Sequence, residues 1–230
     1  MTEMDPGTLI TLVTIVGSTV GIVLGALTPA IVEGRAVLKA LEAAQEPGVR
    51  PALLQALGAV GTDAALHRVR SAVDSDDEQV RDTAVRVLSG WESSRAAPVL
   101  LELARDTQHD THRILCLRGF VRLARETPIA ERIQMLTRAG DVARTAGVRK
   151  LIISAWGSTP APEALRALVD YLQDSAVRTE AAAAIVGVAE QLSDDHPDAV
   201  KGAMEAVLEV LETGTFRERA KKLLNEVEAK

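Results

Sequence analysis

Aromatic residues and cysteine are scarce in this sequence, and each shortage excludes a class of fold. Aromatic residues make up 2% of the chain, so alanine, leucine and valine supply most of the apolar side chains. That composition favours closely packed helices over a β-sandwich or a β-barrel. The single cysteine, Cys116, rules out an internal disulfide framework and fits a reducing compartment. We therefore expect an all-α fold.

Motifs that carry catalysis are also missing. The sequence has no glycine-rich phosphate loop and no GxSxG segment. The segment His109-Asp110-Thr111-His112 lacks the third and fourth ligands of a metal site, and we interpret it as a turn with a helix cap. The formal net charge of −6 gives no general attraction to nucleic acids. We predict no enzyme activity, no cofactor and no nucleic-acid partner.

Charged residues are absent from residues 6–32, a run of 27 residues. A helix of this length can cross the hydrocarbon core of a bilayer, which is about 30 Å thick. Glu3 and Asp5 precede the run and Arg35 follows it, so the positive-inside rule places the C-terminal part in the cytoplasm. We predict a membrane-anchor domain over residues 1–46 with a single transmembrane helix. The alternative is a helix buried in a cytoplasmic protein.

Small residues recur within this run at four-residue intervals. Gly17, Gly21 and Gly25 would share one face of the helix. A face of glycines lets two transmembrane helices approach closely. We predict that these three are helix-packing residues and that the chain forms a homo-oligomer.

Residues 47–230 are periodic, and we predict one domain of stacked helical pairs. Six helices are expected to begin near a pair of residues whose second member is arginine, at intervals of 29 to 39 residues. Apolar residues follow the first member by four and by eight positions, which marks one buried stripe along a helix. These start pairs are Val49-Arg50, Val80-Arg81, His112-Arg113, Val148-Arg149, Val177-Arg178 and Phe216-Arg217.

A second helix is expected after each of the first five start-pair helices. The expected ranges are residues 64–73, 96–105, 129–142, 162–172 and 196–211. We expect Trp91, Phe120 and Trp156 to pack between helices, and Cys116 to be a small core side chain. Five of the start-pair arginines are expected to be partly exposed, each near an acidic side chain or a carbonyl of the preceding pair. They are Arg50, Arg81, Arg113, Arg149 and Arg178.

The segment DEQVRDTAVRVL (77–88) resembles a HEAT repeat, in which a valine-arginine pair opens a helix. The segments HRILCLRGFVRLARE (112–126), GVRKLIISAWG (147–157) and TPAPEALRALVDYL (159–172) are similar to HEAT-like domains of multidomain bacterial proteins. The resemblance covers residues 47–229. It implies an α-solenoid that binds or scaffolds proteins.

The segment MDPGTLITLVTIVGSTVGIVLGALTPAIVEGRAVLKALEAAQEPG (4–48) resembles the first transmembrane helix of ATP synthase subunit c, especially the sodium-type rotor subunits. The resemblance implies that Glu33 coordinates the transported cation, Na⁺ or H⁺. It also implies that the glycine face packs copies into a ring. Subunit c has a second helix with the essential carboxylate, whereas no second apolar span follows residue 48 here. The alternative for Glu33 is a carboxylate at the membrane surface.

Three functions remain open at this point. The first is a membrane-tethered HEAT-repeat adaptor that binds a protein partner through its solenoid surface. The second is a component of an ion-translocating ring, with Glu33 in the ion path. The third is a soluble HEAT-repeat accessory protein of an enzyme, because the HEAT-like fold also occurs in enzymes.

Overall fold

A computed structural model of the chain describes residues 49–229, and every regular element among them is a helix. The chain divides into two compact units, Met1–Gly119 and Phe120–Lys230. The boundary falls inside α8 (Asp110–Arg125). The all-α fold expected from the composition is confirmed over the described residues.

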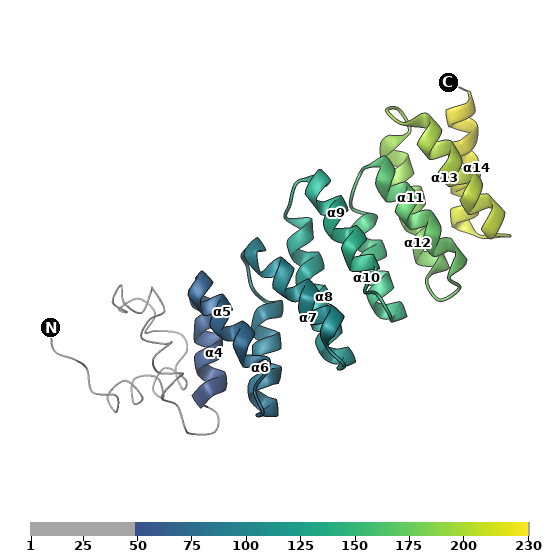
Figure 1. Cartoon of the computed structure of the whole chain (residues 1–230). Coiled ribbons are helices and arrows are strands. Elements are labelled where there is room, and N and C mark those ends of the chain that lie inside the picture. The colour runs from purple at the N-terminus through teal and green to yellow at the C-terminus, as the bar shows by residue number, and fades with distance from the viewer. Residues whose placement is uncertain (1–48, 230) are drawn as a thin grey trace, which may run out of the picture. The chain divides into compact units, whose positions relative to one another are not determined.

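The first unit pairs helices in two layers (Figure 1). One layer holds α4, α6 and the start of α8, and the other holds α5 and α7, which follows the short 3₁₀ turn Ser94–Ala96. In this unit α4 packs on α6, and α5 packs on both α4 and α6. The bounds are Val49–Val60 for α4, Asp63–Ala72 for α5, Glu78–Ser89 for α6 and Ala97–Asp106 for α7.

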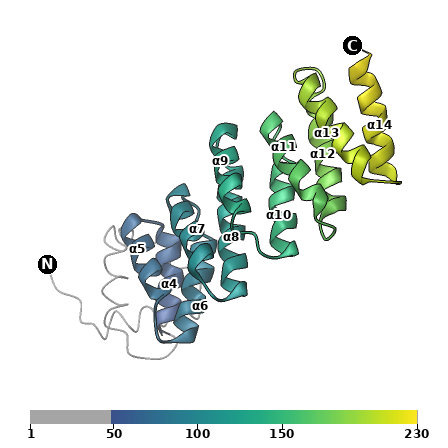
Figure 2. The same ribbon diagram turned by 45° about the vertical axis from the view of Figure 1, so that its right-hand side comes forward.

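The second unit, taken by itself, also pairs its helices in two layers (Figures 1 and 2). The α10 layer consists of the end of α8 with α10 (Ala146–Trp156), α12 (Arg178–Leu192) and α14 (Thr215–Glu228). The α11 layer consists of α9 (Ile129–Gly140), α11 (Pro162–Asp170) and α13 (Pro197–Val210), with the 3₁₀ turn Tyr171–Gln173 after α11. Within the layers α10 packs on α12, α12 on α14, and α11 on α13.

The buried stripe predicted from the spacing is confirmed at all but one position. The residues four and eight positions after the first member of each start pair are buried, from Leu53 and Leu57 in α4 to Ala220 in α14. The exception is Leu224, which is half-buried, while its neighbour Leu223 is 7% exposed. α14 packs on α12 and α13 with Ala220, Leu223 and Val227 as its buried residues. Trp91, Trp156 and Phe120 are buried, as expected.

Short polar side chains fix where several helices begin. The Thr62 hydroxyl accepts from the Ala65 N–H, and Asp77 Oδ1 accepts from the Gln79 N–H at 2.9 Å. The first amides of a helix have no intrahelical acceptor, so such caps select the starting residue. Thr145 caps α10 in the same way.

No helix between residues 49 and 229 has the length and apolar character needed to cross a membrane. The predicted span, residues 6–32, lies outside the described residues. The predicted domain boundary near residue 46 also lies outside them, and both stay predictions.

Candidate functional site

The site residues predicted in the N-terminal segment are Gly17, Gly21, Gly25 and Glu33, and all four lie outside the described residues. Helix packing by the glycines and cation binding by Glu33 therefore stay predictions.

His109 and His112 lie at the start of α8, with ring centroids 5.1 Å apart. His112 Nε2 lies 2.6 Å from Asp82 Oδ1 on α6, so this side chain joins two successive helices of one layer. Sequence reasoning missed this contact, because Asp82 is 30 residues away. Over residues 49–229, no cluster of three or more His, Cys, Asp or Glu side chains is arranged to hold a metal ion.

Cys116 is fully buried in the first unit, as its place in the stripe predicted. Burial raises the pKa of its thiol to about 12, because the apolar surroundings disfavour the thiolate. The reactive form of cysteine is the thiolate. Cys116 is thus a core side chain that stays protonated at neutral pH.

Several start-pair arginines bind carbonyls of the segment that precedes their own helix. Arg81 donates to the Ser75 and Asp76 carbonyls, and Arg178 donates to the Leu172 carbonyl at 2.8 Å. Ser75 and Asp76 lie in the loop after α5, and Leu172 lies in the 3₁₀ turn after α11. Carbonyls in such segments lack a regular helical partner, and a guanidinium can satisfy them. The expected carbonyl contacts are confirmed for Arg81, Arg149 and Arg178.

Arg113 corrects the prediction that all of these arginines are partly exposed, because it is 4% exposed. Its Nε donates to the Ala104 carbonyl at 3.2 Å, Nη2 donates to the Thr107 carbonyl, and Nη1 pairs with Asp110. A buried charge is costly unless it is paired and hydrogen-bonded, and these three acceptors replace water. In the sequence, the burial of Arg113 could have been predicted only from Asp110, an acidic partner three residues earlier.

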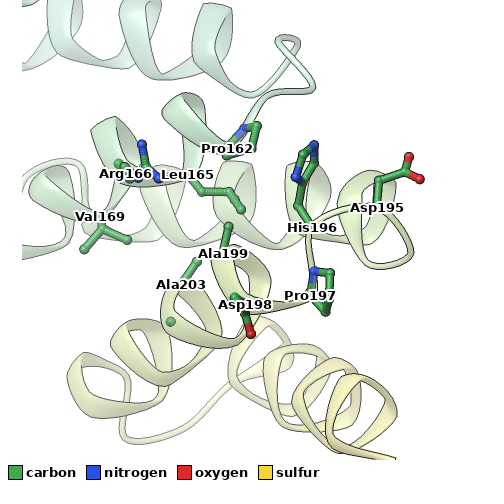
Figure 3. Close-up of a pocket in the computed structure, with 11 residues that line it drawn as sticks. Pro162, Leu165, Arg166, Val169, Asp195, His196, Pro197, Asp198, Ala199 and Ala203 are labelled. Atoms are coloured by element: carbon green, nitrogen blue, oxygen red, sulfur yellow. The ribbon is translucent and has the colours of Figure 1, made fainter. Parts of the chain in front are cut away.

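An open groove of about 720 Å³ runs between α11 and α13 (Figure 3). Leu165 and Ala203, both buried, belong to its apolar lining. Figure 3 shows Arg166 on one side of the groove and His196 and Asp195 on the other. The remaining lining residues are Pro162, Val169, Pro197, Asp198, Ala199 and Gly202.

Small residues on α13 keep this groove open. Ala199, Gly202 and Ala203 line it at helical spacing. A Cβ atom added to Gly202 would meet no atom within 4 Å, so the space beside it is unfilled. The three small residues at intervals of three and four positions could have indicated a groove along this helix, but the sequence analysis did not predict one.

Comparison with known proteins identifies a repeat family in the first half of the chain. No curated protein matches the chain. A crystal structure of an engineered protein is similar at 18% identity over 98% of each chain, with a TM-score of 0.44. A cryo-EM structure of a de novo designed 16-helix transmembrane nanopore is similar at 16% identity over 97% of this chain and 64% of that chain, with a TM-score of 0.16.

The family match agrees with the HEAT resemblance stated from the sequence. It spans residues 34–119, which includes the start pairs of α4, α6 and α8. The helical pairs seen from α4 to the start of α8 are the structure expected of such repeats. Residues 34–119 therefore carry HEAT repeats.

Proposed function

We propose that this chain is a membrane-tethered adaptor that binds a protein partner through its helical repeats and has no catalytic activity of its own. The observation that carries the binding role is the match of residues 34–119 to HEAT repeats. Stacked helical repeats present broad faces for binding, and each repeat contacts only its neighbours. The uncharged run from residue 6 to residue 32 supports the tether.

In the second unit, the α11 layer is the face that we propose for the partner. Among the described residues of α9, α11 and α13, only Lys201 forms an ion pair, and its partner is Glu228 on α14. The α10 layer differs, because Lys150 pairs with Glu180 and Arg219 pairs with Glu190. Charges without internal partners are available to a second protein.

Site-resolved photo-crosslinking of the full chain in cells tests this proposal. A photoreactive amino acid replaces Arg138 on α9 or Arg166 on α11, and Lys150 on α10 or Lys222 on α14 serves as the control. We expect the α9 and α11 positions to crosslink to one common protein. Crosslinks from the control positions alone, or none from any position, would contradict the proposal.

A further inference from the structure

We propose that the groove between α11 and α13 binds a basic segment of a protein partner and seats one aliphatic side chain of that segment between the two helices. The inference rests on the proposed protein-binding function and adds the chemistry of the partner.

The shape and lining of the groove suit an aliphatic side chain. Leu165 is 1% exposed and Ala203 is 4% exposed, so both belong to the core and present only their outer atoms to the groove. Pro162, Val169 and Ala199 are half-buried around them. An aliphatic side chain placed here would remove apolar surface from water on both sides of the contact, which favours binding.

Carboxylates beside the groove select a basic partner. Asp198, Glu205 and Glu209 are exposed and share one face of α13 with Gly202, because the intervals are four, three and four residues. None of these three carboxylates forms an ion pair within 4 Å in the described part of the chain.

Lys201, also on α13, is attracted to Glu205 and Asp198, but its direct ion pair is with Glu228 of α14. Lys201 Nζ lies 2.8 Å from Glu228 Oε1. Arg166 is the one arginine that lines the groove, and it lies on α11. Asp195, at the opposite end of the groove, adds a further carboxylate (Figure 3). Lysine or arginine side chains flanking the aliphatic residue would meet the carboxylates of α13.

A protein segment fits these features better than other ligands. A nucleic acid or an anionic lipid would bring phosphates to the acidic face of α13, where like charges repel. The groove is open along one side, so a chain can lie across it while one side chain enters. Opposite charges at the rim would raise the rate of association and fix the orientation of the segment.

Peptide selection provides the probe for the test. A phage-displayed library of random peptides of about 12 residues is selected against the full chain in mild detergent, and fluorescence anisotropy then measures the affinity of the enriched peptides. We expect enriched peptides to combine lysine or arginine with a leucine, isoleucine or valine. We also expect their binding to weaken as the salt concentration rises.

Two matched variants locate the binding site. Gly202→Leu fills the groove, whereas Gly187→Leu places the same side chain on α12, and a Cβ atom at either glycine meets nothing within 4 Å. Leucine is also a better helix former than glycine, so both variants are expected to fold. We expect Gly202→Leu to weaken peptide binding at least tenfold and Gly187→Leu to leave it unchanged. Glu205→Lys combined with Glu209→Lys should weaken it by a similar factor.

Three results would overturn the inference. They are the absence of any enriched peptide, enriched peptides without basic residues, and equal binding by Gly202→Leu and Gly187→Leu. If crosslinks from α9 and α11 persist while any of these results is found, the proposed function stands and only the groove assignment is wrong. If the photoreactive residues on α9 and α11 give no crosslink to a common protein, the proposed function itself is wrong.

Discussion

Arginine has two different roles in this chain, and the difference depends on whether the side chain is buried. Arg113 and Arg118 both lie on α8, yet Arg113 is 4% exposed and bonded to α7 carbonyls, whereas Arg118 is exposed. The first holds the end of one helix against the start of the next. The second is free to contact solvent or a partner.

Arg113→Ala should lower the free energy of unfolding by about 2 to 3 kcal/mol, because it leaves the Ala104 and Thr107 carbonyls without their donor. Urea unfolding of the full chain, followed by circular dichroism, measures the change. Arg118→Ala is the matched control and should change stability by less than about 0.5 kcal/mol. Equal small effects of the two substitutions would show that the Arg113 bonds contribute little.

Gly119→Ala should destabilise the first unit by about 1 to 3 kcal/mol, because the added methyl group overpacks a close helix contact. Its Cβ atom would lie 2.6 Å from the Ser89 carbonyl oxygen and 2.9 Å from Ser89 Cα, which are backbone atoms of α6. Gly202→Ala is the control, since its Cβ atom meets nothing and alanine raises helix propensity. Thermal unfolding should show a lower midpoint for the first variant and an equal or higher midpoint for the second. Unchanged stability of Gly119→Ala would contradict the close contact.

Cys116 should react slowly with a thiol reagent at pH 8 in the native chain and quickly in denaturant. Burial raises its pKa from 9.0 to about 12, so the folded chain keeps the thiol protonated while the unfolded chain begins to ionise. The same shift means that this group's contribution to stability is present below pH 9 and is lost as the pH rises toward 12. Colorimetric thiol titration measures the rates. Equal rates in the native and denatured chain would contradict the burial.

At the scale of single helices, α14 depends on the helix before it. Arg217 donates to the Leu208 and Leu211 carbonyls at the end of α13, and Arg219 pairs with Glu190 on α12. Gly214 precedes α14 with a φ of 110°, which favours glycine. These contacts fix the start of the last described helix.

Arg217→Ala should therefore increase amide hydrogen exchange in α14 while α4 and α6, which belong to the other unit, keep their protection. Exchange followed by mass spectrometry measures both regions in one sample. Lys221→Ala, an exposed change on the same helix, should leave exchange unaltered. Faster exchange in both variants would show that α14 responds to any substitution.

The helices were largely predictable from the sequence, because each combines an apolar stripe with local start and stop signals. The ranges expected for the second helices agree with α5, α7, α9, α11 and α13 to within two residues at each end. Contacts between helices were not predictable from one sequence. The His112–Asp82 contact, the burial of Arg113 and the groove beside Gly202 all depend on how a neighbouring helix is placed.

At the scale of the whole chain, successive repeats are held by polar contacts between residues about 30 positions apart. Asp82 with His112 in the first unit, and Lys150 with Glu180 and Glu190 with Arg219 in the second, follow this interval. The Lys150–Glu180 and Glu190–Arg219 pairs are exposed, and such pairs contribute only about 0 to 1 kcal/mol each, so the buried stripe supplies most of the stability.

The membrane tether is tested by alkaline carbonate extraction of the full chain. We expect the chain to stay with the membrane fraction. Val16→Arg combined with Leu24→Arg should release it, because each arginine near the bilayer centre costs about 2.5 to 3.5 kcal/mol. Val16→Leu combined with Leu24→Ile is the control and should behave like the original chain. Extraction of the unchanged chain into the supernatant would contradict the tether.

The most direct test of the account is a hydrogen-exchange footprint of the full chain with the purified protein that crosslinks to α9 and α11. The account predicts that binding slows exchange in the α11 layer, on α9, α11 and α13, because the partner covers that face. Exchange in α10, α12 and α14 should remain as in the free chain. Protection confined to α10, α12 and α14, or no protection at saturating partner, would contradict the claim that this chain is a protein-binding adaptor acting through the α11 layer.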